Sequence, residues 1–171
     1  MIAKALRPIS PGQWVVMPMI ASLGGSILLA LPVRIAGLQL PEPVFALVPA
    51  FVWALGKPSA APPFALLILG LALDLLWGGA IGVWPCALLA AYALTLSARR
   101  ILAGQEFIAL WGAFALACAG AFVVGFLLVA LRAGHAPNLV GVGLQFFASA
   151  AMFPFAWRLL ERYEATDARY R

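Results

Sequence analysis

Charged side chains are scarce in this chain of 171 residues, and their scarcity argues against a water-soluble domain. Only 10% of the residues are charged, whereas 65% are hydrophobic, and the mean hydropathy is +1.03. Because water-soluble domains are about half apolar and about a quarter charged, a soluble chain of this length cannot bury so much apolar surface. We therefore expect an integral membrane protein.

The residue patterns of most enzymes are missing as well. Ser, His and Asp form no triad pattern, there is no glycine-rich phosphate loop, and His135 has no second ligand at metal-binding spacing. Cys86 and Cys118 lie inside apolar runs and are expected to be small core residues. The sequence predicts no catalytic residue, no metal and no cofactor. The net charge of +5 is interpreted as a signal for membrane orientation, not for nucleic-acid binding.

The long apolar runs leave room for helices and little else. At about 20 residues per transmembrane helix, the chain accommodates about six helices and no second domain. We expect one all-α, polytopic transmembrane domain over residues 1–171, with spans at about 14–33, 41–56, 62–77, 81–97, 107–131 and 139–160. The second of these is the weakest, and it either crosses as a kinked helix or re-enters from one side.

The basic residues decide between these two topologies. With six crossings, nine of the eleven Lys and Arg residues share one side of the membrane, and only Arg34 and Arg132 lie on the other. If the second run did not cross, this bias would vanish. Because cytoplasmic loops are enriched in Lys and Arg, we expect six crossings, both termini in the cytoplasm and contact with anionic lipid. The nine are Lys4, Arg7, Lys57, Arg99, Arg100, Arg158, Arg162, Arg169 and Arg171.

Asp74 is the only acid well inside an apolar run. An ionised carboxylate at the centre of a transmembrane helix costs roughly 2.5–3.5 kcal/mol on insertion scales, so it is expected to be paired, protonated or functional. Gly70, Gly78 and Gly82 surround it, and glycine permits tight turns and close backbone approach. We predict a membrane hairpin that turns between Trp77 and Gly82. Asp74 either binds a partner, a ligand or a proton, or hydrogen-bonds within the bundle.

A stripe of small residues follows the fifth predicted helix. Its members recur every four residues and allow close helix packing: Ala113, Ala117, Ala121 and Gly125. Such a stripe is also a candidate docking face for another membrane protein. On the sixth predicted helix, Gln145 and Ser149 are expected to form hydrogen bonds between helices.

The segment from Gly70 to Gly82 resembles the signature of the MreD family of rod shape-determining membrane proteins. The matching residues are Gly70, Asp74, Gly78, Ile81 and Gly82. Ala80 departs from the pattern, because many members carry proline there. The resemblance implies a non-enzymatic inner-membrane subunit of the elongation (rod) complex that takes part in peptidoglycan synthesis. Its implied partners are MreC, the MreB filament (directly or indirectly), a RodA-type glycosyltransferase and its penicillin-binding partner.

The resemblance also supplies an alternative function. The family's bundle is similar to the substrate-binding component of energy-coupling-factor transporters, which implies a vitamin-binding or other small-molecule-binding membrane subunit. Ala21 and Gly25 are similar to the small-residue motif by which those subunits dock on their transporter. A vitamin binder needs a polar-lined pocket beneath its outer loops, whereas a scaffold needs an exposed helix face.

Overall fold

The computed structural model describes residues 11–30, 34–35, 38–39, 43–56, 60–134, 136–155, 157–158 and 161. His135 and the basic residues before residue 11 and after residue 161 lie outside these residues, as does Lys57. The described residues form six helices and one short strand pair, so the all-α prediction is confirmed in outline. The elements are α1 (Pro11–Ala30), β1 (Arg34–Ile35), β2 (Leu38–Gln39), α2 (Leu47–Leu55), α3 (Ala61–Trp77), α4 (Val83–Leu102), α5 (Phe107–Ala133) and α6 (Leu139–Ala150).

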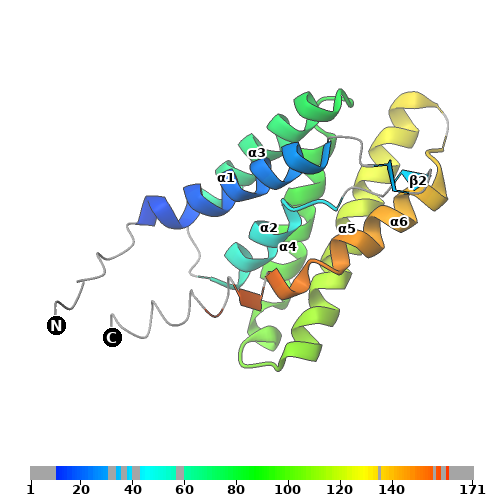
Figure 1. Cartoon of the computed structure of the whole chain (residues 1–171). Coiled ribbons are helices and arrows are strands. Elements are labelled where there is room, and N and C mark those ends of the chain that lie inside the picture. The colour runs from blue at the N-terminus through cyan, green and yellow to red at the C-terminus, as the bar shows by residue number, and fades with distance from the viewer. Residues whose placement is uncertain are drawn as a thin grey trace.

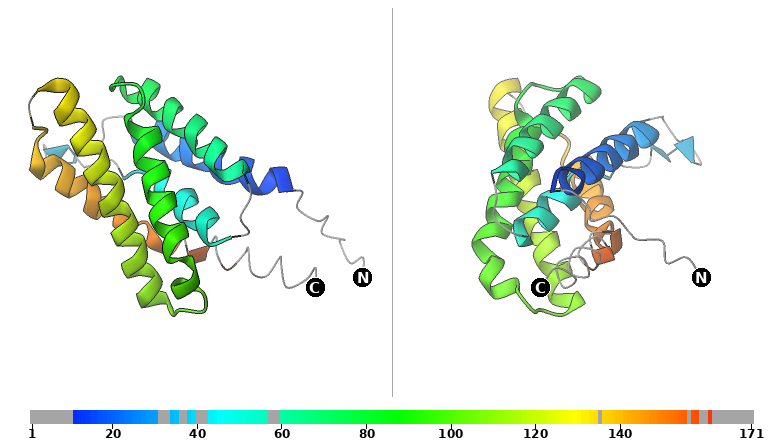
Figure 2. Two further views of the ribbon diagram at one scale, coloured as in Figure 1. Left: turned by 180° about the vertical axis from the view of Figure 1, so that it is seen from behind. Right: turned by 90° about the vertical axis from the view of Figure 1, so that its left-hand side faces the viewer.

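The helices pack around α4, which contacts α2, α3 and α5 (Figures 1 and 2). α5 runs antiparallel beside α4, α6 lies along α5, and α1 packs on α3. Three buried rings join α2, α5 and the turn after α6: Phe51 meets Phe114 edge-on at 5.3 Å between ring centroids, and Phe153 lies 6.4 Å from Phe51. The core therefore lies where α2, α4 and α5 meet.

α2 is shorter than the predicted span over 41–56, and nearly all of it is buried. It has nine residues, of which eight, Leu47 to Ala54, are buried, and at 1.5 Å per residue it is only about 13 Å long. Backbone polar groups of the non-helical residues just before α2 form hydrogen bonds with side chains of other helices. The Val44 N–H donates to Ser149 Oγ at 2.9 Å, and Ser22 Oγ donates to the Phe45 carbonyl at 3.4 Å.

α6 is interrupted inside the predicted span over 139–160: it ends at Ala150, residues 151–152 form a turn, and helix resumes at 153–155. Pro154 explains the interruption. Proline has no N–H to donate to the carbonyl four residues earlier, and its ring clashes with that carbonyl. The carbonyl in question belongs to Ala150, the last residue of α6. It accepts instead from the indole Nε1 of Trp111 on α5 at 3.1 Å. A prediction based on hydropathy alone missed this break.

Two helices, α4 with 20 residues and α5 with 27 residues, are long and apolar enough to cross a membrane. The apolar helices over Val15–Ile27, Ala61–Trp77 and Leu139–Phe155 are shorter. The outward faces of α1, α3, α5 and α6 carry exposed large apolar side chains, among them Met17, Phe64, Leu116 and Phe147. Extensive apolar surface of this kind is unusual for a soluble monomer, and it agrees with the membrane class expected from composition.

The pair β1–β2 was not predicted. Arg34 pairs with Gln39 and Ile35 with Leu38 in an antiparallel register. The pair lies between α1 and α2 in the chain, in the short segment between the first two predicted spans.

Candidate functional site

The turn between α3 and α4 lies where the sequence predicts it, because two glycines adopt conformations that other residues rarely adopt. α3 ends at Trp77, and Gly78 follows with φ +63°. Gly82 precedes α4 with φ +98°. A Cβ atom makes such left-handed conformations costly. Gly78 and Gly82 are therefore required by the path of the backbone, and five residues, 78–82, separate two antiparallel helices.

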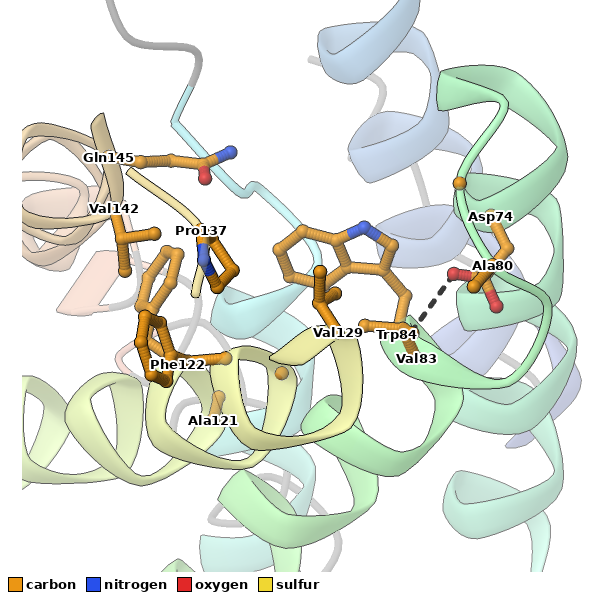
Figure 3. A pocket seen from close by; sticks show the side chains of 13 residues that line it. Asp74, Ala80, Val83, Trp84, Ala121, Phe122, Val129, Pro137, Val142 and Gln145 are labelled. Atoms are coloured by element: carbon orange, nitrogen blue, oxygen red, sulfur yellow. Dashed lines mark hydrogen bonds between the residues drawn. The ribbon is translucent and has the colours of Figure 1, made fainter. Parts of the chain in front are cut away.

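Asp74 closes this turn. Its side chain is 1% exposed, and its two carboxylate oxygens accept hydrogen bonds from the next helix. The Gly82 N–H donates to Oδ2 at 2.6 Å, and the Trp84 N–H donates to Oδ1 at 3.0 Å; the second bond is drawn in Figure 3. The carboxylate thus lies at the N-terminus of α4, where the helix dipole favours negative charge.

These bonds complete the hydrogen bonding at the start of α4. The first N–H groups of a helix have no partner inside the helix. Here the Val83 N–H donates to the Ala80 carbonyl, the Trp84 N–H donates to Asp74, and Pro85 has no N–H. The next group, the Cys86 N–H, donates to the Gly82 carbonyl at 3.3 Å. Asp74 therefore supplies the acceptor that this partly buried helix end needs, which supports the structural alternative for this residue.

Gly70 fixes the distance between the two helices of the hairpin. A Cβ atom on Gly70 would lie 2.4 Å from the Pro85 nitrogen and 2.5 Å from the Pro85 Cα. Both are backbone atoms, so no side-chain rotation removes the clash. Gly70 is thus the contact point of α3 and α4, one helical turn before Asp74.

Arg132 ties the end of α5 to the same turn. Its Nη1 donates to the Ile81 carbonyl at 2.6 Å, and Nη2 lies 3.8 Å from the position of a Cβ on Gly82. The charge pattern of the sequence predicted for Arg132 only the side of the membrane on which it lies. The bond joins residues 51 positions apart, so no local sequence pattern indicated it.

A chain of aromatic rings near this turn connects α3, α4, α5 and α6. Trp77 on α3 meets Trp84 on α4 edge-on, with 4.9 Å between ring centroids. Trp84 lies 6.3 Å from Phe122 on α5, and Phe122 lies 6.2 Å from Phe146 on α6. Edge-to-face pairs at such distances are each worth about 0.5–1.5 kcal/mol beyond the area they bury. These ring contacts link the α3–α4 hairpin to α5 and α6.

The small-residue stripe of α5 lies mostly inside the bundle. Ala117 and Ala121 are 4% and 1% exposed, and Ala113 and Gly125 are partly buried. Gly125 would place a Cβ 3.9 Å from Val83 of α4. The stripe packs within this chain, so the expectation that it supplies an exposed docking face is wrong. Gly120, which the sequence analysis did not single out, makes the tightest approach, to Leu94.

A cavity of about 180 Å³ lies beside the hairpin, between the turn, α5 and α6 (Figure 3). Its walls are mainly apolar, with Asp74 and Gln145 as the polar side chains that reach it. Ser149, the other polar residue predicted on the sixth helix, is instead buried one turn further on, where it receives the Val44 N–H and donates to the Gln145 carbonyl at 2.8 Å.

The described residues hold no group of three or more His, Cys, Asp or Glu side chains that could bind a metal ion. Comparison of the chain with models of protein families, with curated proteins and with solved structures gave no match. The support for a function therefore comes from the geometry of the hairpin and of the surfaces around it.

Proposed function

We propose that the chain is a multi-pass inner-membrane protein with six crossings, both termini in the cytoplasm and the α3–α4 turn on the outer side. The described charges support this orientation. Arg99 and Arg100 lie at the end of α4. Arg158 follows Trp157, whose ring packs on Phe107 at the start of α5 with 5.2 Å between centroids, so it belongs to the same end of the bundle. Arg132 is at the opposite end of α5. Of the five described Lys and Arg residues, three thus lie at the end proposed to be cytoplasmic, against Arg132 and Arg34 on the side proposed to be outer.

The second crossing is the one that needs explanation, because α2 alone is too short for a hydrocarbon core of about 30 Å. Non-helical backbone is tolerated at membrane depth where protein surrounds it and satisfies its polar groups. The residues before α2 meet this condition, since Ser149 and Ser22 bond Val44 and Phe45. We propose that the non-helical residues 43–46 and α2 cross together as one broken span inside the bundle.

Within this membrane frame we propose a non-enzymatic scaffold role like that of the MreD family: binding MreC and cell-wall synthases in the elongation complex. The observation that carries the proposal is the hairpin. Three glycines and one acid underlie the resemblance, and each has a separate task in the turn: close approach at Gly70, helix capping at Asp74, and left-handed backbone at Gly78 and Gly82. A sequence pattern that encodes a rigid turn suits a scaffold protein, which binds its partners through a fixed surface and carries out no reaction.

As the partner surface we propose the outer face of α5, which is one of several apolar outward faces of the bundle, and not its small-residue stripe. Large apolar side chains cover this face and are between 52% and 80% exposed: Ile108, Leu116, Val123, Leu127 and Leu131. In a membrane this face meets lipid or the transmembrane helix of a partner.

The vitamin-binding alternative has less support. Gly25 is one of the two residues similar to the transporter-docking motif. A Cβ atom on Gly25 would lie 3.1 Å from the ring of Phe45, so this glycine packs against a residue of the same chain. The cavity beside the hairpin also has mainly apolar walls, whereas a vitamin needs several polar contacts.

The proposal is tested by affinity capture of the tagged chain from native membranes, with identification of the bound proteins by mass spectrometry. We expect MreC and a RodA-type glycosyltransferase with its penicillin-binding partner. A double substitution, Leu116→Ala with Leu127→Ala, should reduce this capture, and Val16→Ala with Ile20→Ala on α1 is the matched control. Recovery of a transporter ATPase module instead would overturn the scaffold proposal.

A further inference from the structure

The cavity beside the hairpin has the lining of a small-molecule site. Trp84, Phe122 and Phe126 contribute aromatic rings, and Val129 and Val142 contribute aliphatic walls. Ligand sites in proteins are typically concave, mostly apolar and furnished with a few polar groups that fix orientation. A cavity of about 150 Å³ lined by apolar side chains stays dry and binds benzene, so the cavity here, at about 180 Å³, is large enough for one aromatic ring.

Gln145 supplies the polar group. Its side chain is directed from α6 toward the side of the cavity where Trp84 lies (Figure 3). The amide of glutamine offers two donor hydrogens and an acceptor oxygen, and the Gln145 side chain takes part in none of the hydrogen bonds found among the described residues, although its backbone carbonyl accepts from Ser149. The amide is thus able to pair with a ligand.

The charges around the cavity favour a neutral ligand. An anion would face the Asp74 carboxylate, which reaches the cavity wall. A cation would gain little from that carboxylate, because both of its oxygens already accept N–H groups at the start of α4, and the Arg132 guanidinium lies over the same turn. An ion of either sign would therefore meet a group of its own sign at this turn, an anion the Asp74 carboxylate and a cation the Arg132 guanidinium.

We propose that this cavity binds a neutral molecule of one aromatic ring that carries a single hydrogen-bonding group, with the ring among Trp84, Phe122 and Phe126 and the polar group on Gln145. Phenol-like and indole-like molecules belong to this class. The site is an addition to partner binding and does not depend on it.

The test uses two probes of nearly equal shape, 4-fluorophenol and fluorobenzene, added to the full chain in lipid nanodiscs and followed by ¹⁹F NMR. Nanodiscs without protein give the partition into lipid. We expect saturable binding of 4-fluorophenol at one site per chain. Val129→Trp, which fills the cavity, should abolish it, whereas Val123→Trp, the same change on the exposed face of α5 (Val123 is 57% exposed), should leave it unchanged.

Gln145→Leu tests the hydrogen bond separately. Because one hydrogen bond is worth about a five- to tenfold change in affinity, this variant should weaken 4-fluorophenol by about that factor and change fluorobenzene less than about twofold. Equal weakening of both probes would overturn the role of Gln145. Uptake that rises linearly with probe concentration in the wild-type chain, as in empty nanodiscs, would overturn the site itself without bearing on the capture of MreC.

Discussion

Replacing Gly70 by alanine tests whether the hairpin is as tightly constrained as its geometry indicates. The added Cβ would lie 2.4 Å from the Pro85 nitrogen and 2.5 Å from its Cα. Carbon atoms at their optimal separation are about 3.5–4.0 Å apart, so α3 and α4 must separate by about 1 Å at this point. Both contacted atoms belong to the backbone, and for that reason Pro85→Ala should not rescue the variant.

The cost has two parts. Overpacking a well-packed core typically costs about 1–3 kcal/mol. The same separation lengthens the two bonds that Asp74, one turn along α3, accepts from the Gly82 and Trp84 N–H groups, which are 2.6 and 3.0 Å long in the wild-type chain. Because a hydrogen bond to a charged group is worth about 1.5–3 kcal/mol, weakening one of them brings the expected loss to about 3–5 kcal/mol of unfolding free energy.

The assay is unfolding of the purified chain in mild detergent by added sodium dodecyl sulfate, followed by circular dichroism. Gly120→Ala is the matched control. Its Cβ would approach Leu94 Cδ1 even more closely, at 2.2 Å, but this is the tip of a flexible side chain that is 46% exposed. Rotation of Leu94 relieves the clash, so we expect a loss below about 1 kcal/mol. Gly112→Ala, which meets nothing within 4 Å, should be neutral or slightly stabilising.

A result in which Gly70→Ala unfolds within about 0.5 kcal/mol of the wild-type chain, the range of ordinary surface changes, would refute this reasoning. A larger loss for Gly120→Ala than for Gly70→Ala would refute it as well, because the mobility of the contacted atom would then not decide the cost.

Three further substitutions test other contacts in the same unfolding assay. Asp74→Ala removes both acceptors at the start of α4 and should cost about 2–4 kcal/mol, whereas Asp74→Asn keeps one acceptor and should cost less; equal losses would argue against capping. Asp74→Ala should also lower the yield of folded protein and the capture of partners together. Loss of capture without loss of folded protein would indicate that Asp74 contacts a partner directly. Ser149→Ala leaves the buried Val44 N–H without its acceptor and should cost about 1–3 kcal/mol, against less than about 0.5 kcal/mol for the exposed Ser97→Ala. Trp111→Phe frees the Ala150 carbonyl and should cost about 1 kcal/mol; no change would mean that water replaces the indole.

The hairpin was predictable because its determinants are local. Gly78 and Gly82 interrupt an apolar run that is too long for one helix, and the observed turn begins and ends within the predicted segment, between Trp77 and Gly82. Gly78 also marks the end of α3, and Gly82 marks the start of α4. The role of Asp74 remained open in the sequence, because an acid in an apolar run is equally compatible with a partner site and with a cap.

The features that the sequence did not reveal depend on contacts between distant segments. The bonds from Arg132 to Ile81 and from Val44 to Ser149 join residues 51 and 105 positions apart. The small-residue stripe of α5 was recognised by its spacing, but spacing alone does not distinguish an internal neighbour, here α4, from an external partner. The break in the sixth predicted helix after Ala150 was available in principle from Pro154, but a continuous apolar run masked it.

The orientation of the hairpin underlies both the membrane proposal and the choice of partner surface, and it can be measured directly. In a chain with Cys86→Ala and Cys118→Ala, Gly79→Cys places a thiol on the exposed α3–α4 turn, and Gln105→Cys places one at the exposed opposite end of α4. A membrane-impermeant maleimide should label the first variant from outside the inner membrane, and the second only after the membrane is permeabilised. Labelling of both from the same side would contradict the account, because α4 would then not cross the membrane.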